Sequence, residues 1–66
     1  MNVIINGIER NYTSQLTLEK LLVKLGHANN KVAVEVNEEI IPRSQLGNKL
    51  VVDGDKIEII IAVGGG

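Results

Sequence analysis

The stretch Lys56-Ile57-Glu58-Ile59-Ile60-Ile61 is followed directly by Ala62-Val63-Gly64-Gly65-Gly66, where the sequence ends. Six residues this rich in isoleucine predict a β-strand, and the side chains of a strand alternate between its two faces. One face carries Ile57, Ile59 and Ile61, which we expect to enter the core. The other face carries Glu58, Ile60 and Ala62, which places the apolar Ile60 on an outer surface.

The glycines after this strand are the candidate functional site. Glycine has no Cβ, so a glycine tail can extend through a narrow tunnel and leaves its carboxyl carbon open to attack. We expect a folded domain over residues 1–61 and a flexible tail over 62–66. Gly66 would be the reacting residue, and Gly64 and Gly65 would enter partner active sites with it. The alternative is a frayed terminus without function.

The length of the tail suits this role. Five residues extend by roughly 17 Å, at ~3.3 to 3.6 Å per residue. The folded domain can therefore stay docked outside a partner while Gly66 reaches a buried active site.

Composition argues against several classes of function. A chain of 66 residues is one domain with a small core. It has no cysteine, which removes a disulfide framework and a thiolate site and fits a reducing cytoplasm. Its net charge of −1 and its single aromatic residue, Tyr12, make nucleic acid an improbable partner. No apolar run approaches the ~20 residues of a membrane span, and the N-terminus lacks the pattern of a signal peptide.

The first half of the chain predicts a hairpin and a helix. Asn6-Gly7 suits a two-residue type I′ turn between Val3-Ile4-Ile5 and a strand from Ile8 to Tyr12. Such a turn places the apolar Val3 opposite the charged Arg10. Either a bulge therefore shifts the pairing, or Arg10 lies at an open edge of the sheet.

The main helix is predicted by a stripe of leucines. The stripe consists of Leu18, Leu21, Leu22 and Leu25. Thr17 suits the N-cap, and Gly26 suits the left-handed position after the helix.

The second half predicts further strands. Val32, Val34 and Val36 alternate with Ala33 and Glu35, as in a strand with one buried face. A turn around 37–39 then leads to Ile40-Ile41-Pro42-Arg43, where the proline indicates a sheet edge or a strand end. Asp53-Gly54-Asp55 is a turn in which Gly54 can take a positive φ.

No side chain suggests catalysis by this chain. His27 has no neighbouring Ser, Cys or second His, so we expect it to be solvated beyond the helix. Glu38 and Glu39 are adjacent on a turn without an apolar pocket to separate their pKa values, and we interpret them as solubilising charges. We expect no catalytic residue, no metal site and no bound cofactor.

A partner surface is one interpretation of the outer apolar residues. If the first and last strands are neighbours, Ile4 shares the outer face with Ile60 and Ala62, and together they could form a docking patch. The alternative is that isolated exposed apolar residues are normal and need no partner.

The order of these elements resembles a known fold. One helix against a mixed sheet of four to five strands, with a glycine tail after the last, resembles the α+β β-grasp fold of ubiquitin-like proteins. Within it, the chain is similar to the sulfur carriers of thiamine thiazole biosynthesis. The similarity rests on four segments of the sequence: residues 3–7, residues 36–43, Asp53-Gly54-Asp55 and the final Gly65-Gly66. Gly64 departs from the family, where a bulkier residue often stands.

The resemblance implies a protein cosubstrate rather than an enzyme. A ubiquitin-activating-type adenylating enzyme would use ATP and Mg²⁺ to join Gly66 to AMP. A persulfide sulfur donor would then displace AMP and leave a thiocarboxylate, from which thiazole synthase would take the sulfur. The free carrier is expected to be a cytoplasmic monomer.

Two alternatives stay open at this stage. The chain could be a sulfur carrier for molybdopterin, cysteine or methionine synthesis, which would use the same terminal chemistry with another acceptor. It could also be a ubiquitin-like protein modifier or a plain binding module.

Overall fold

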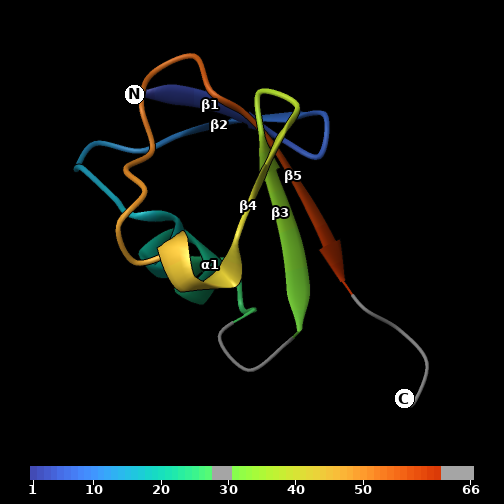
Figure 1. Ribbon diagram of the computed structural model, residues 1–66. Coiled ribbons are helices and arrows are strands. Elements are labelled where there is room, and N and C mark those ends of the chain that lie inside the picture. The colour runs from blue at the N-terminus through green and yellow to red at the C-terminus, as the bar shows by residue number, and fades with distance from the viewer. Residues whose placement is uncertain (28–30, 62–66) are drawn as a thin grey trace.

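The architecture is a five-stranded mixed sheet with one α-helix on one face, seen here in a computed structural model that describes residues 1–27 and 31–61 (Figure 1). The strands are β1 (Asn2–Ile5), β2 (Ile8–Asn11), β3 (Val32–Val36), β4 (Glu39–Ile41) and β5 (Lys56–Ile61). The helices are α1 (Leu18–Lys24) and the short 3-10 helix η1 (Arg43–Gln45). The strand order is β2-β1-β5-β3-β4, with β1 and β5 parallel and the other neighbours antiparallel. The predicted β-grasp architecture is confirmed.

The β1–β2 hairpin has the predicted two-residue turn. Asn6 and Gly7 have φ values of 50° and 81°, the positive values that a type I′ turn requires at both positions. Ile5 is opposite Ile8 and Val3 is opposite Arg10 without a bulge. Arg10 is exposed on the edge strand β2, so the second of the two alternatives is correct.

Helix α1 begins and ends at the predicted residues. The Thr17 hydroxyl accepts a hydrogen bond from the Lys20 N–H at 3.2 Å, as an N-cap does. Beyond the helix, Gly26 has φ 85°. The N–H of Gly26 bonds to the Val23 carbonyl, and the N–H of His27 to that of Leu22, which completes a Schellman motif. At seven residues, α1 is too short to span a membrane, and no other helix in the described ranges could do so.

The β3–β4 connection is tighter than predicted. Asn37 and Glu38 alone form the turn, with φ values of 52° and 71°, and Glu39 already belongs to β4. Pro42 ends the edge strand β4, as predicted. It is followed by η1, which the sequence pattern did not indicate.

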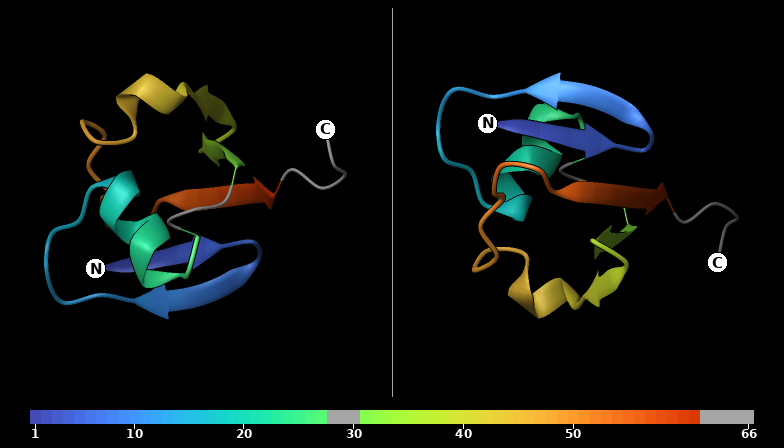
Figure 2. Two further views of the ribbon diagram at one scale, coloured as in Figure 1. Left: turned by 90° about the horizontal axis from the view of Figure 1, so that it is seen from below. Right: turned by 90° about the horizontal axis from the view of Figure 1, so that it is seen from above.

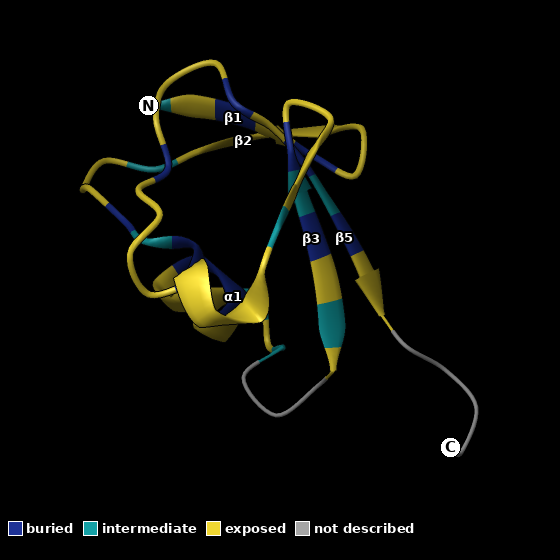
Figure 3. Cartoon of the chain, in the orientation of Figure 1, coloured by how far each residue is buried: buried dark blue, intermediate teal, exposed yellow. Residues whose placement is uncertain are grey.

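The core lies between α1 and the inner face of the sheet (Figures 2 and 3). Its buried apolar side chains are Val3, Ile5, Leu16, Leu18, Leu21, Leu22, Val34, Val36, Leu46, Val51, Ile57 and Ile59. The prediction that Ile61 enters the core is wrong, because its side chain is 43% exposed. Ile61 does share the inner face, but it ends the strand, where its neighbour Val32 is itself only half-buried.

Candidate functional site

The candidate site is the point where the central strand β5 leads into the glycine tail. β5 ends at the periphery of the molecule, away from the N-terminus (Figures 1 and 2). Ile61 is the last described residue of this strand. Ala62, Gly64, Gly65 and Gly66 lie outside the described residues, so the predicted roles of the tail remain predictions.

β5 is paired with β3 along almost its whole length and with β1 only at its start. It pairs with β1 through Ile4↔Lys56 and Ile5↔Ile57. It pairs with β3 over five positions, from Val36↔Ile57 to Val32↔Ile61. The strand that precedes the tail is therefore fixed by backbone hydrogen bonds along almost its whole length.

Asn6 extends the β1 side of this ladder beyond the end of β1. Its Oδ1 accepts a hydrogen bond from the Ile59 N–H at 2.7 Å, and its Nδ2 donates to the Ile59 carbonyl at 3.2 Å. The side-chain amide thus occupies the place of a further strand residue. The sequence pattern indicates Asn6 only as a turn residue.

A second asparagine fixes the start of β5. The Asn37 Oδ1 accepts from the Lys56 N–H at 3.0 Å, and the Asn37 N–H donates to the Lys56 carbonyl at 2.7 Å. Its Nδ2 donates to Asp55 Oδ1 at 3.0 Å, while Asp55 Oδ2 accepts from the Val52 N–H at 2.9 Å. Asp55 is only 5% exposed. Its structural role was not predicted, because an Asp-Gly-Asp pattern indicates a turn but not which carboxylate is buried.

The outer face of the sheet carries the predicted apolar residues. Ile60 is 56% exposed and Ile4 is 38% exposed, and their strands are neighbours. Ile4 is level with Lys56, however, which lies four residues before Ile60 on β5. At ~3.3 Å per residue, the two isoleucines are about 13 Å apart along the strand. They share a face but do not form one continuous patch.

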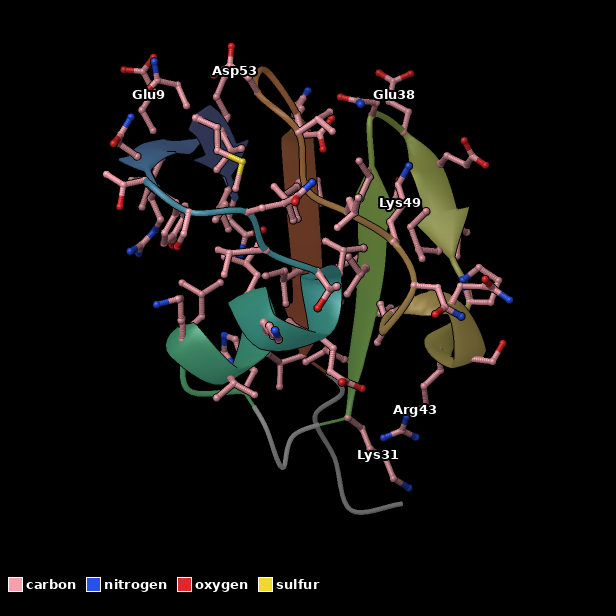
Figure 4. All side chains as sticks on the ribbon, turned by 90° about the vertical axis from the view of Figure 1, so that its left-hand side faces the viewer. Glu9, Lys31, Glu38, Arg43, Lys49 and Asp53 are labelled. Carbon is pink, nitrogen blue, oxygen red and sulfur yellow. The ribbon has the colours of Figure 1, made fainter. Side chains whose placement is uncertain are left out.

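The charged residues that the sequence pattern singled out lie elsewhere in the described part of the chain. Glu38 lies at the tip of the β3–β4 turn, at the opposite end of the molecule from Lys31 and Arg43 (Figure 4). His27 is half-buried and lines a shallow hollow with Glu19 and Arg43, so it is less solvated than predicted. Within residues 1–27 and 31–61, no group of three or more His, Asp or Glu residues could hold a metal ion.

The chain is similar in sequence and in structure to a known family. Residues 3–66 match the model of the ThiS family. The chain belongs to the ThiS family. A solved structure of the thiamine biosynthesis protein (ThiS) from Geobacter metallireducens superposes with a TM-score of 0.84 and 33% identity, covering all of both chains.

Two curated relatives differ in how much of their length is ThiS-like. The chain is 29% identical to the sulfur carrier protein ThiS of Escherichia coli over the whole length of both. It is 50% identical to a thiazole synthase of Paramagnetospirillum magneticum, but it spans only 20% of that protein.

Proposed function

We propose that this ThiS-family chain is a sulfur carrier of thiamine biosynthesis whose sulfur is borne by Gly66. The observation that carries the proposal is the family match over residues 3–66, which includes the glycines after β5. The similarity to a protein named as a sulfur carrier and to a thiazole synthase supports the same pathway.

The chemistry starts from an unreactive group. A carboxylate is a poor electrophile because its negative charge repels nucleophiles and its oxygen is a poor leaving group. In the proposed first step, a Gly66 carboxylate oxygen attacks the α-phosphorus of ATP, and pyrophosphate leaves. The resulting acyl adenylate has a neutral carbonyl and a good leaving group, AMP. The adenylating enzyme, of the ubiquitin-activating type, supplies ATP and Mg²⁺.

Sulfur enters in the second step. The terminal sulfur of a persulfide attacks the acyl carbon, and AMP leaves. A thiol then breaks the S–S bond that still joins the sulfur to its donor, and the donor sulfur and this thiol end as a disulfide. The product is a thiocarboxylate on Gly66, whose sulfur is a nucleophile that thiazole synthase accepts.

In this scheme the chain is a cosubstrate. Its described residues keep β5 rigid through the sheet ladder and through Asn6 and Asn37, so that a partner that docks on the folded domain receives the tail from a fixed point. The tail residues Gly64, Gly65 and Gly66 would enter the partner's active site.

The test is to incubate the chain with its adenylating enzyme, MgATP and a persulfide donor, and to measure its intact mass. Replacement of one oxygen by sulfur adds about 16 Da, which is nearly the mass that oxidation of Met1 to the sulfoxide would add. Alkylation of the thiocarboxylate separates the two, since the sulfoxide does not react. A chain that gains no alkylatable sulfur, or that forms isopeptide-linked conjugates instead, would contradict the proposal.

A further inference from the structure

The β1–β2 turn carries a chemically reactive pair, Asn6-Gly7. The backbone nitrogen of the residue that follows an asparagine can attack the side-chain Cγ and expel ammonia, which leaves a cyclic imide. Glycine permits this attack best, because it has no Cβ to shield its nitrogen. Asn6 and Gly7 are both exposed, so water can reach the imide and open it.

The fold holds the Asn6 side chain away from this reaction. Its Oδ1 accepts from the Ile59 N–H at 2.7 Å, and its Nδ2 donates to the Ile59 carbonyl at 3.2 Å. The Asn6 N–H also donates to the Ile57 carbonyl at 2.9 Å. Cγ cannot rotate toward the Gly7 nitrogen while both side-chain bonds are intact. The reaction therefore has to wait until the Asn6 amide separates from β5.

The products of the reaction no longer fit against β5. Water opens the imide to either aspartate or isoaspartate. An aspartate carboxylate can only accept hydrogen bonds, so the oxygen that replaces Nδ2 would face the Ile59 carbonyl, which also only accepts. In isoaspartate the main chain runs through the former side chain and gains a methylene group, which is incompatible with a two-residue turn between Ile5 and Ile8. Both products lose the bond from Nδ2 to Ile59.

We propose that Asn6 is a site of spontaneous deamidation whose rate is set by the opening of its two side-chain bonds to Ile59, and that the modified chain holds β5 less firmly. The Gly7 nitrogen forms a bond to Cγ, the bond from Cγ to Nδ2 breaks, and the Gly7 proton leaves with Nδ2 as ammonia. Water then cleaves the imide at one of its carbonyl groups. The net reaction consumes water and releases ammonia, without an oxidant, a reductant or an enzyme, and the inference does not depend on the proposed function.

Asn37 provides an internal control. Its φ is 52°, against 50° for Asn6, and its Oδ1 accepts from the Lys56 N–H at 3.0 Å. It is exposed, as Asn6 is. It is followed by Glu38, however, whose side chain shields the attacking nitrogen. The two asparagines thus share a backbone conformation and an attachment to β5 but differ in the residue that follows.

The test is to incubate the chain in mildly alkaline buffer, with and without concentrated urea, and to locate deamidation by fragmentation mass spectrometry. Asn6 should react at least about tenfold faster in the unfolded chain than in the folded chain, because its bonds to Ile59 are then absent. Asn37 should stay largely unmodified under both conditions.

Gly7→Asn is the matched variant. Asparagine tolerates a left-handed backbone, and a Cβ at position 7 would meet no atom within 4 Å, so the turn should be kept. The new side chain should slow deamidation of Asn6 severalfold in urea, where the fold no longer protects it.

Asn6→Asp reproduces one of the products. It should melt at a lower temperature than the unmodified chain, because it sets a carboxylate oxygen against the Ile59 carbonyl and leaves both without a donor.

Three outcomes would overturn the inference. Equal rates at Asn6 with and without urea would show that the bonds to Ile59 do not control the reaction. Equal rates at Asn6 and Asn37 in urea would show that Gly7 does not direct it. An Asn6→Asp chain that melts as the unmodified chain does would show that deamidation leaves β5 as firmly held as before.

Discussion

At the scale of single residues, two asparagines connect the turns to the central strand. Asn6 and Asn37 both have left-handed backbones, and both use their side-chain amides to bond the backbone of β5. The Asn-Gly pair predicted the first turn because turn geometry is local. The bonds to Ile59 could not be predicted in the same way, since they depend on a strand more than fifty residues further along the chain.

Asn6→Gly tests this link without disturbing the turn. Glycine readily adopts φ 50°, so the substitution removes the two hydrogen bonds to Ile59 without straining the turn, and it adds backbone entropy to the unfolded chain. We expect a loss of about 1 to 2 kcal/mol in the free energy of unfolding, measured by urea denaturation. A variant as stable as the original chain would show that the amide contributes nothing to holding β5.

At the scale of elements, periodicity predicted β5 and α1 well. The two faces of β5 were separated correctly up to Ile60, and the leucine stripe lies on the buried side of α1. The pattern failed at Ile61, because alternation tells which face a residue shares but not where the covering helix stops. It also missed η1, whose three residues are too few for a periodic signal.

The two faces of β5 should respond differently to substitution. Ile59→Ala should cost about 2 to 5 kcal/mol, because it removes buried methyl groups and leaves a cavity. Ile60→Ala should melt almost normally, since Ile60 is 56% exposed. Thermal melts compare the two, and equal losses would mean that the faces are misassigned.

The left-handed glycine after α1 should not tolerate a side chain. Gly26→Ala should destabilise the chain by about 1 to 2 kcal/mol, because alanine is strained in a left-handed backbone conformation. A steric clash would not add to this loss, since a Cβ at Gly26 would meet no atom within 4 Å. Gly47→Ala is the control: its φ is not positive and its Cβ would make only an ordinary contact with the Glu19 carboxylate, at 3.6 Å. If both variants lose the same stability, the strain argument is wrong.

At the scale of the whole molecule, the order of the elements was enough to predict the fold. The sequence pattern indicated four to five strands and one main helix in their order along the chain, and the β-grasp arrangement followed from resemblance. Burial of Asp55 could not be predicted, because its partner Asn37 lies on the distant β3–β4 turn. The pairing of Glu35 with Glu58 on β3 and β5 could not be predicted either, because the sequence of one strand does not determine its register with another.

Removal of Gly65 and Gly66 should separate fold from function. The core residues run from Val3 to Ile59, so the shortened chain should melt as the full chain does. It should give no ATP–pyrophosphate exchange with the adenylating enzyme, because the reacting glycine is gone. Normal exchange by the shortened chain would place the adenylated group elsewhere.

The central claim is that Gly66 itself carries the sulfur. The most direct measurement is fragmentation mass spectrometry of the loaded chain after alkylation of its thiocarboxylate. The account predicts that the label appears in every fragment that contains Gly66 and in none that lacks it. A label on any fragment that ends before Gly66 would contradict it.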